Sequence, residues 1–469
     1  MRLSALSFSK KTLVLGVVLT TFLITGFGCK GASTADQEAT KPITLEYWTV
    51  FDDVDALQKL ITKFHESHPY ITINLRQLTQ AELYPRLVEA LAEDKGPDIV
   101  SVSNRSIGSL KTKLAAMPET VNDTTVAVVK GTVGTNTVIT TVPKKLITPT
   151  QLDRDYVQAV KNDVLIDNKI YGLPLSFDSL ALYYNKDLLD RAGVPEPPRT
   201  WEEFQAAVKK ITKYNAKTDA ITQSGAALGT SNNISVSDDL VYVLYKQSGL
   251  DFVAKNGQPL FNRVPAGTNN GTESPAMSVM NFYTDFANPA RDTYTWNENM
   301  DNALDAFSNG SVAFFFGYNY YLPVIKARAP QLNLGVLPLL QLNPERPMNV
   351  ANYWVQSVTA KSTKQAAAWN LVDYLTHSAA TKEYLDATGR PTALRAYIAA
   401  QSQNVDLLPF ISQVLIADNW YRGNDYEAAS KAVKDMIHEW LLPPPDPNKI
   451  LEWRQNILNR AAQKVQQTL

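Results

Sequence analysis

Residues 43–75 read ITLEYWTVFDDVDALQKLITKFHESHPYITINL. Apolar and polar side chains alternate over residues 43–48, which is typical of a strand. Apolar positions within residues 54–64 recur at helical spacing, and Pro69 ends that pattern. Alternation resumes over residues 71–75. A strand, a helix and a second strand in this order predict a βαβ unit with parallel strands.

The same order continues beyond this stretch. A second helical pattern ends at Gly96-Pro97, and residues 98–102 predict a third strand. Residues 119–150 differ because they are rich in Thr and Val, and they predict a β-hairpin-like excursion. The earlier pattern returns with a strand at residues 180–184. We therefore expect an α/β protein with mixed, mostly parallel sheets flanked by helices.

The composition narrows the classes of protein that fit. A chain of 469 residues has room for two or three domains. Hydrophobic residues make up 45% of the chain, which is enough to form sizeable cores. The net charge of −1 does not provide the strongly positive surface that nucleic-acid binding requires. One cysteine excludes a disulfide framework and a zinc site built from several thiolates. We expect no metal site and no cofactor.

The amino-terminal segment has the features of a secretory signal. Residues 1–11 carry three basic side chains, and residues 13–24 form an apolar run that is short for a membrane span. The only cysteine, Cys29, directly follows the small residue Gly28 in a segment that resembles a lipobox. We predict a lipoprotein signal peptide at residues 1–28 and a flexible tether at residues 29–41. Lipidated Cys29 would hold the protein outside the cytoplasmic membrane.

Acidic side chains follow the first predicted strand. Asp52 and Asp53 lie where α/β sheets commonly bind ligands, so their oxygens are candidates to accept hydrogen bonds from ligand hydroxyls. The alternative is that they cap the next helix. A glycan hydrolase would need two carboxyl groups at a defined separation, and this alternative stays open at the level of sequence.

Several tryptophans lie at predicted strand ends or in loops among polar residues. Trp48, Trp296, Trp354 and Trp420 are of this kind. Their flat rings suit the apolar C–H faces of sugars, while polar neighbours can bind the hydroxyl groups. The alternative is that these rings anchor loops.

The order of these motifs resembles the family 1 extracellular solute-binding proteins, which are maltodextrin-binding-like receptors of ABC importers. Three further stretches carry the resemblance besides the opening strand and helix. They are Gly96-Pro97-Asp98-Ile99-Val100, then Tyr171-Gly172-Leu173-Pro174 with Asp178, Tyr183–Leu189 and Pro198–Phe204, and finally Ala306–Gly310 with Ala313 and the later helix Ala366–Leu375.

The resemblance implies a two-lobed, type II periplasmic-binding-protein-like fold with a hinge between the lobes. We place residues 42–177 and 317–378 in the first lobe. Residues 178–316 and 379–469 then form the second lobe. A cleft between the lobes would bind the ligand and close on it.

The resemblance also assigns site residues. It places Asp178 at the hinge, Asn104 and Arg105 after the third strand, and Tyr318 and Asn319 after an apolar strand. The candidate ligand-binding residues are Trp48, Asp52, Asp53, Asn104, Arg105, Asp178, Tyr318, Asn319, Trp354, Trp420 and Arg422. No catalytic residue is expected.

The favoured hypothesis is a lipid-anchored, monomeric receptor that captures a carbohydrate for an ABC importer without altering it. Its partners would be the solute, the permease subunits and the membrane that holds the anchor on Cys29. One alternative is the same fold with a polyamine, phosphate ester or metal chelate, which the acidic residues Asp52, Asp53 and Asp178 would suit if it were a cation. The other is the extracellular glycan hydrolase.

Overall fold

The structure is a computed structural model that describes residues 33–130, 135–254, 256–265 and 272–469. The predicted signal peptide and Cys29 lie outside this part. Within the predicted tether, Ser33 caps a short exposed helix, α2 (Thr34–Ala39), so this segment is partly helical. None of the helices in the described ranges is both long and apolar enough to cross a bilayer.

The first lobe is built on a mixed sheet of five strands with the order β2-β1-β3-β15-β8. The strands β1, β2 and β3 run parallel, while β15 is antiparallel to both of its neighbours. Their bounds are β1 (Ile43–Thr49), β2 (Ile71–Gln77), β3 (Ile99–Ser103), β8 (Leu173–Pro174) and β15 (Trp354–Val358). The predicted βαβ unit at the start of the chain is therefore present.

Helices cover the first sheet and close its core. Their apolar faces share one buried cluster with the strands, for example through Leu57, Leu60 and Phe64 of α3. The helices are α3 (Val54–Ser67), α4 (Gln80–Ala92), α5 (Ile107–Leu110), α6 (Pro149–Asp155), α7 (Gln158–Val164), α14 (Gln365–His377), α15 (Ala379–Thr388) and α16 (Arg395–Gln401). Short strands β6 (Leu165–Ile166) and β7 (Lys169–Ile170) pair beside α7.

The second lobe is built on a five-stranded sheet with the order β10-β11-β12-β9-β13. Only the β11–β12 pair is parallel, so this sheet is mixed but mostly antiparallel, unlike the prediction. Its strands are β9 (Ala181–Asn185), β10 (Lys213–Tyr214), β11 (Ile221–Ala226), β12 (Val312–Gly317) and β13 (Leu334–Pro338). Every residue of the central strand β12 is buried.

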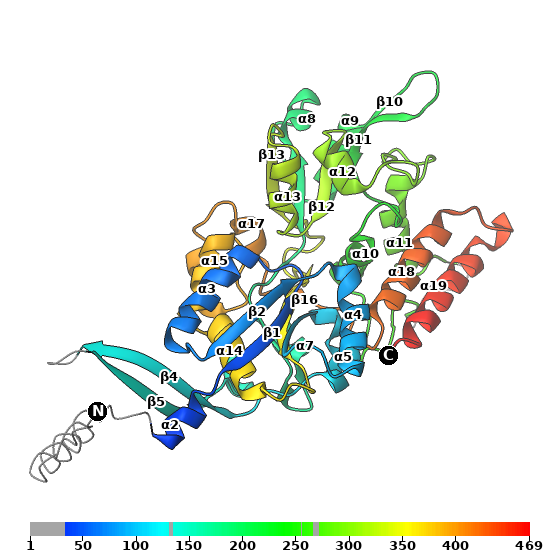
Figure 1. The fold of residues 1–469 in the computed structure, drawn as a ribbon. Coiled ribbons are helices and arrows are strands. Elements are labelled where there is room, and N and C mark those ends of the chain that lie inside the picture. Colours follow the sequence, from blue (N-terminus) through cyan, green and yellow to red (C-terminus); the bar gives the residue numbers. More distant parts are fainter. Residues whose placement is uncertain (1–32, 131–134, 255, 266–271) are drawn as a thin grey trace, which may run out of the picture.

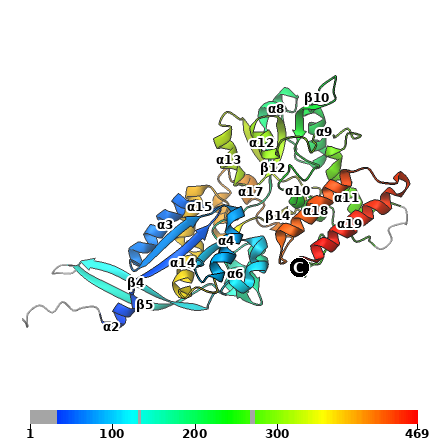
Figure 2. The same cartoon turned by 45° about the vertical axis from the view of Figure 1, so that its right-hand side comes forward.

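The helices of the second lobe pack around this sheet and continue into a carboxy-terminal helical pair (Figures 1 and 2). They are α8 (Lys186–Arg191), α9 (Trp201–Ile211), α10 (Ser237–Gln247), α11 (Pro275–Thr284), α12 (Ala303–Ser308), α13 (Tyr321–Arg328), α18 (Tyr426–Leu441) and α19 (Ile450–Gln466). Each lobe thus has a hydrophobic core of its own.

The predicted hairpin is confirmed. Strands β4 (Thr120–Lys130) and β5 (Thr135–Lys145) pair antiparallel along their whole length. They form a two-stranded ribbon that projects from the first lobe on the side of α2 (Figure 1).

Three strand segments lie side by side where the described chain passes between the lobes. Ser179 bridges Ala351, and β14 (Asn349–Val350) runs parallel to β16 (Ala417–Asp418). The Ala351 N–H donates to the Asp418 carbonyl at 2.9 Å. The short helix α17 (Leu408–Ile411) lies just before the third crossing.

The predicted lobe boundaries differ from this arrangement at two of the three crossings. The first crossing lies near Asp178, and the return lies at Ala351 rather than near residue 317. The chain remains in the second lobe because β13 pairs with β9 there. Likewise, Tyr384 of α15 belongs to the core of the first lobe, so residues just after 379 do not join the second.

Candidate functional site

A cavity of about 300 Å³ lies between the two lobes. Both lobes line it, and its walls combine aromatic, hydroxyl, amide and charged side chains. The lining residues include Phe51, Asp52, Tyr84, Arg105, Asp178, Asp239, Tyr318, Asn319, Tyr320, Trp354, Arg390 and Tyr426.

Strand ends and helix starts place these side chains. Phe51 and Asp52 follow β1, Arg105 follows β3, and Tyr318 follows β12, so the carboxyl ends of buried strands open onto the cavity. Asp239 lies in the first turn of α10 and Tyr426 begins α18. Rigid elements from both lobes therefore hold the site, as is usual for ligand clefts of α/β proteins.

Three half-buried aromatic rings form one wall. The ring of Phe51 lies 5.3 Å from that of Trp354 and 5.6 Å from that of Tyr320, measured between centroids. Phe51 and Trp354 belong to the first lobe and Tyr320 to the second, so this wall crosses between the lobes. Partly exposed rings of this kind offer flat apolar faces to a ligand.

Asp52 is held by the strand ends beneath it. Its Oδ2 accepts hydrogen bonds from Ser101 Oγ at 2.8 Å, from Gln356 Nε2 at 3.1 Å and from the hydroxyl of Thr49. Oδ1 has no donor among the described residues. A fixed carboxylate with one oxygen left over can accept a hydrogen bond from a ligand hydroxyl.

Arg105 joins the lobes across the cavity. Its Nη2 lies 2.8 Å from Asp239 Oδ1, and its guanidinium lies over the ring of Tyr426 at 4.9 Å. It also donates to the hydroxyls of Tyr426 and Tyr318. Burial is the largest single effect on the pKa of Arg105 and lowers it, but the Asp239 carboxylate and the neighbouring groups of the second lobe together raise that pKa well above its usual range, so the side chain stays charged.

Asp178 lies at the first crossing between the lobes. Its carboxyl group accepts from the backbone N–H groups of Ser179 and Asn319, both at 2.9 Å, and of Tyr320 at 3.2 Å. Burial raises the pKa of Asp178 to about 7, against the lowering effect of these bonds. The Asp178 carboxyl group thus connects Ser179, at the start of the second lobe, with residues 319–320, which contribute one ring to the aromatic wall.

The chain matches the family model described as bacterial extracellular solute-binding protein over residues 59–406. It belongs to that family. This is a family of solute-binding receptors and not of enzymes. The match therefore argues against the alternative that the chain is a glycan hydrolase. The expected α/β two-lobed fold and the expected family are both confirmed.

Individual relatives are distant. The multiple sugar-binding protein of Streptococcus mutans is 23% identical over 88% of each chain. A putative binding protein of Brucella abortus is also 23% identical, and the match spans about half the length of that relative. Among solved structures, a cyclic alpha-maltosyl-1,6-maltose binding protein from Arthrobacter globiformis has a TM-score of 0.68 at 18% identity, covering 91% of this chain and 99% of that one.

Six of the predicted site residues of this solute-binding protein line the cavity. They are Asp52, Arg105, Asp178, Tyr318, Asn319 and Trp354. Part of this grouping follows from the strand ends, because the loops after β1 and β3 of the first sheet and after β12 of the second sheet open onto the same cavity. As ligand-binding residues they stay predictions.

Two predicted aromatic platforms lie elsewhere. Trp48 is an internal residue of β1, only 7% exposed, with the Arg76 guanidinium 5.5 Å from its ring. Trp420 is 1% exposed in the core of the second lobe and meets Phe252 edge-on at 5.4 Å. Trp296, a third tryptophan of the same group, is also fully buried in the core of the second lobe. All three rings therefore pack inside the protein.

Three predicted polar residues also lie outside the cavity wall. Asp53 caps α3 by accepting from the Ala56 N–H at 2.8 Å. Asn104 and Arg422 both bind the buried carboxylate of Asp163, at 3.0 and 2.8 Å. Because Asn104 belongs to the first lobe and Arg422 follows the third crossing, this cluster supports the junction of the lobes rather than the cavity.

Several lining residues were missed. Tyr84, Asp239, Arg390 and Tyr426 come from helices or from the end of α15, and their local sequence has no motif that separates them from surface residues. Phe51 could have been found, since it stands beside Asp52 in the loop after the first strand.

Proposed function

We propose that this solute-binding protein captures a short carbohydrate in the cavity between its lobes and delivers it to an ABC importer. The observation that carries the proposal is the wall of Phe51, Trp354 and Tyr320, which faces the same cavity as the fixed polar groups of Asp52 and Arg105. Sugars need both surfaces, because their rings have apolar C–H faces and polar rims.

The size and charge of the cavity favour a short neutral saccharide. A volume of about 300 Å³ is at the lower end of the range for ligand pockets. Its charged lining residues include both acids, such as Asp52 and Asp178, and bases, such as Arg105 and Arg390. A polyamine or another cation gains little from such a mixed lining.

Binding is coupled to the approach of the two lobes. The ligand would touch Asp52 and Trp354 of the first lobe and Tyr320 of the second, so it favours the conformation in which the lobes meet. The three crossing segments provide a hinge for this movement. The permease would then recognise the closed conformation.

Names of relatives support a carbohydrate and an importer. The matches include a galactooligosaccharide-binding protein of Bacillus subtilis and a probable ABC transporter-binding protein of Deinococcus radiodurans. We further propose that Cys29 is lipidated and holds the mature chain, as a monomer, at the outer face of the cytoplasmic membrane.

The test is calorimetry on the chain from Lys30 onward with mono- to tetrasaccharides. We expect at least one to bind with a micromolar Kd, which corresponds to about −8 kcal/mol. Spermidine and inorganic phosphate serve as the non-sugar arms. Heat from either of these, with none from any sugar, would reject the carbohydrate assignment.

A further inference from the structure

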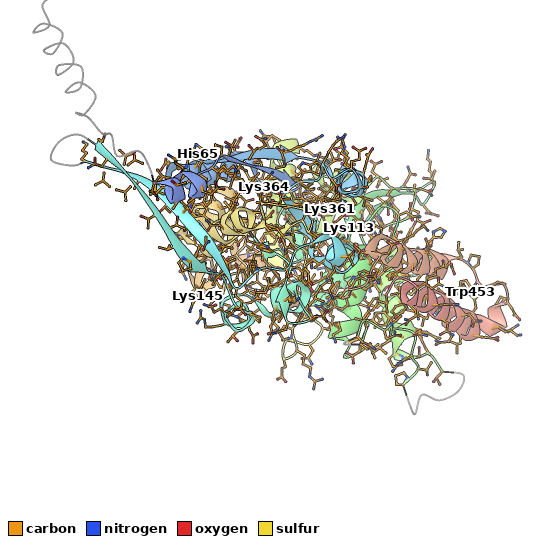
Figure 3. All side chains as sticks on the ribbon, turned by 60° about the horizontal axis from the view of Figure 1, so that its bottom comes forward. His65, Lys113, Lys145, Lys361, Lys364 and Trp453 are labelled. Carbon is orange, nitrogen blue, oxygen red and sulfur yellow. The ribbon has the colours of Figure 1, made fainter. Side chains whose placement is uncertain are left out.

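Arg390 is a cation of the cavity wall, and it forms no ion pair with any of the described residues. Lys364, which Figure 3 labels on the surface of the first lobe, instead lies 3.1 Å from Asp98. Within the described ranges the Arg390 guanidinium makes one hydrogen bond, from Nη2 to the carbonyl of Phe51. Its other N–H donors are therefore available to a ligand in the cavity.

The same bond fixes Arg390 beside Asp52. The Phe51 carbonyl that accepts from Arg390 belongs to the peptide unit just before Asp52. On the other side of Asp52, the Asp53 N–H donates to the hydroxyl of Tyr384 in α15 at 3.0 Å. Burial raises the pKa of the Tyr384 hydroxyl, the charge of Asp52 raises it further and the charge of Arg390 lowers it, so both charges lie near this group.

The backbone that carries Arg390 is held by Gln401, at the end of α16. Gln401 Nε2 donates to the Arg390 carbonyl at 2.9 Å, and Gln401 Oε1 accepts from the Thr392 N–H at 2.8 Å. Between them, the Pro391 carbonyl accepts from the Phe177 N–H at 2.9 Å. Gln401 is only 8% exposed and lies outside the cavity wall. The place of Arg390 in the cavity therefore depends on a side chain behind that wall.

Asp52 and Arg390 offer opposite hydrogen-bonding groups next to the aromatic wall. The free Oδ1 of ionised Asp52 can only accept, and the guanidinium of Arg390 can only donate. A sugar ring stacked on Phe51 presents its hydroxyl groups at its rim, and each hydroxyl can both donate and accept. One hydroxyl can thus donate to Asp52 while its neighbour on the ring accepts from Arg390.

We propose that Arg390 determines the specificity of the cavity by binding, together with Asp52, two adjacent free hydroxyl groups of a neutral sugar ring. Gln401 is the positioning residue for Arg390. The inference rests on the proposed function, because it names the part of the carbohydrate that the same cavity selects. A ring that lacks either hydroxyl is rejected, since a polar group of the site then has no partner.

The test is calorimetry on the chain from Lys30 onward with maltose, maltotriose, cellobiose, lactose and β-1,4-mannobiose. The sugar that binds most tightly is then compared with its analogues that each lack one hydroxyl group. In the unaltered protein, removal of either of two adjacent hydroxyls should weaken binding by about 10–100-fold. No binding of any of these sugars overturns the inference. The proposed function fails as well only if the wider panel of mono- to tetrasaccharides gives no heat.

Substitutions then assign the two hydroxyls. In Arg390→Met, loss of the hydroxyl that Arg390 binds should weaken binding by less than about twofold, whereas loss of the one that Asp52 binds should keep its full effect. Gln401→Ala should reduce the effect of the first loss to an intermediate value. Arg395→Met and Gln403→Ala, at exposed positions outside the cavity wall, are the matched controls and should leave both effects unchanged.

The same comparison can overturn each part of the proposal. If Arg390→Met weakens binding but every analogue keeps its effect, Arg390 binds no hydroxyl and the proposal fails. If Gln401→Ala lowers the melting temperature and leaves the effects of the analogues unchanged, Gln401 supports packing alone and its positioning role is overturned. Should Arg390→Met not fold, Arg390→Lys provides the comparison. It keeps the charge but loses the planar fork, so the effect of the first loss should fall by at least about threefold.

Discussion

Arg105 of the first lobe and Asp239 of the second form an ion pair at 2.8 Å, with side chains that are only 5% and 4% exposed. Opening the cleft would separate the two charges and return both to water. The pair is therefore an interaction of the closed conformation, and its loss should change closure more than folding. Because each lobe has its own core, the two effects can be measured separately.

Asp239→Asn should weaken binding of the sugar found by calorimetry by about 10–100-fold. The substitution leaves the Arg105 guanidinium buried without its counter-charge in the closed state, which is costly, whereas the open state is hydrated. The melting temperature of the free protein should change much less. Asp435→Asn is the control, because Asp435 pairs with Lys431 on the surface and such pairs contribute little.

A double-mutant cycle isolates the pair itself. We expect Arg105→Met combined with Asp239→Leu to lose less affinity than the sum of the two single changes, since no unpaired charge remains. Additive losses would mean that the two side chains act independently on the ligand.

Trp48→Ala and Trp354→Ala should have opposite effects. Trp48 is packed within the first lobe, so its truncation should lower the free energy of unfolding by about 3–5 kcal/mol and leave sugar affinity within about threefold. Trp354 lines the cavity, and its truncation should weaken binding by about 2 kcal/mol with a smaller loss of stability. Thermal denaturation and calorimetry on both variants measure this. If Trp48→Ala abolished binding in a fully folded protein, its placement in the core would be contradicted.

The sequence predicted the parts of the site that follow strands. Hydrophobic alternation identifies a strand, and its end marks where polar side chains such as Asp52 and Arg105 gather. The same rule misplaced Trp48, because the strand continues through Thr49 and the loop residue is Phe51. A one-residue uncertainty in the end of a strand is enough to exchange a core ring for a cavity ring.

The crossings between the lobes were harder to predict. The apolar strand β12 ends at Gly317 with a polar segment, which looked like a return to the first lobe. The chain instead adds α13 and β13, and it crosses only at Ala351. Which sheet a strand joins depends on its pairing with strands that are far away in the sequence. The local pattern of apolar and polar residues does not indicate that pairing.

The residues Asn104 and Arg422 illustrate a related difficulty. Both are polar and follow strands, as ligand-binding residues do, but both bind Asp163, whose pKa is raised by burial. Asn104→Ala should therefore lower the free energy of unfolding by about 1–3 kcal/mol, because it removes a hydrogen bond from a buried carboxyl group. Chemical denaturation measures this. The matched change Asn162→Ala, at a more exposed position on α7, should have little effect.

Asp178 should make stability depend on pH. Its pKa is about 7 in the folded protein, because of burial, and near 3.8 when unfolded. Between these values the folded state holds a proton that the unfolded state has lost, so the free energy of unfolding should fall as the pH rises from about 4 to 7. Above pH 7 both states are ionised and this contribution no longer changes. Asp178→Asn should remove this slope, whereas Asp190→Asn, at an exposed position in α8, should keep it. Urea denaturation at a series of pH values measures both, and an identical slope in the two variants would show that Asp178 does not take up the proton.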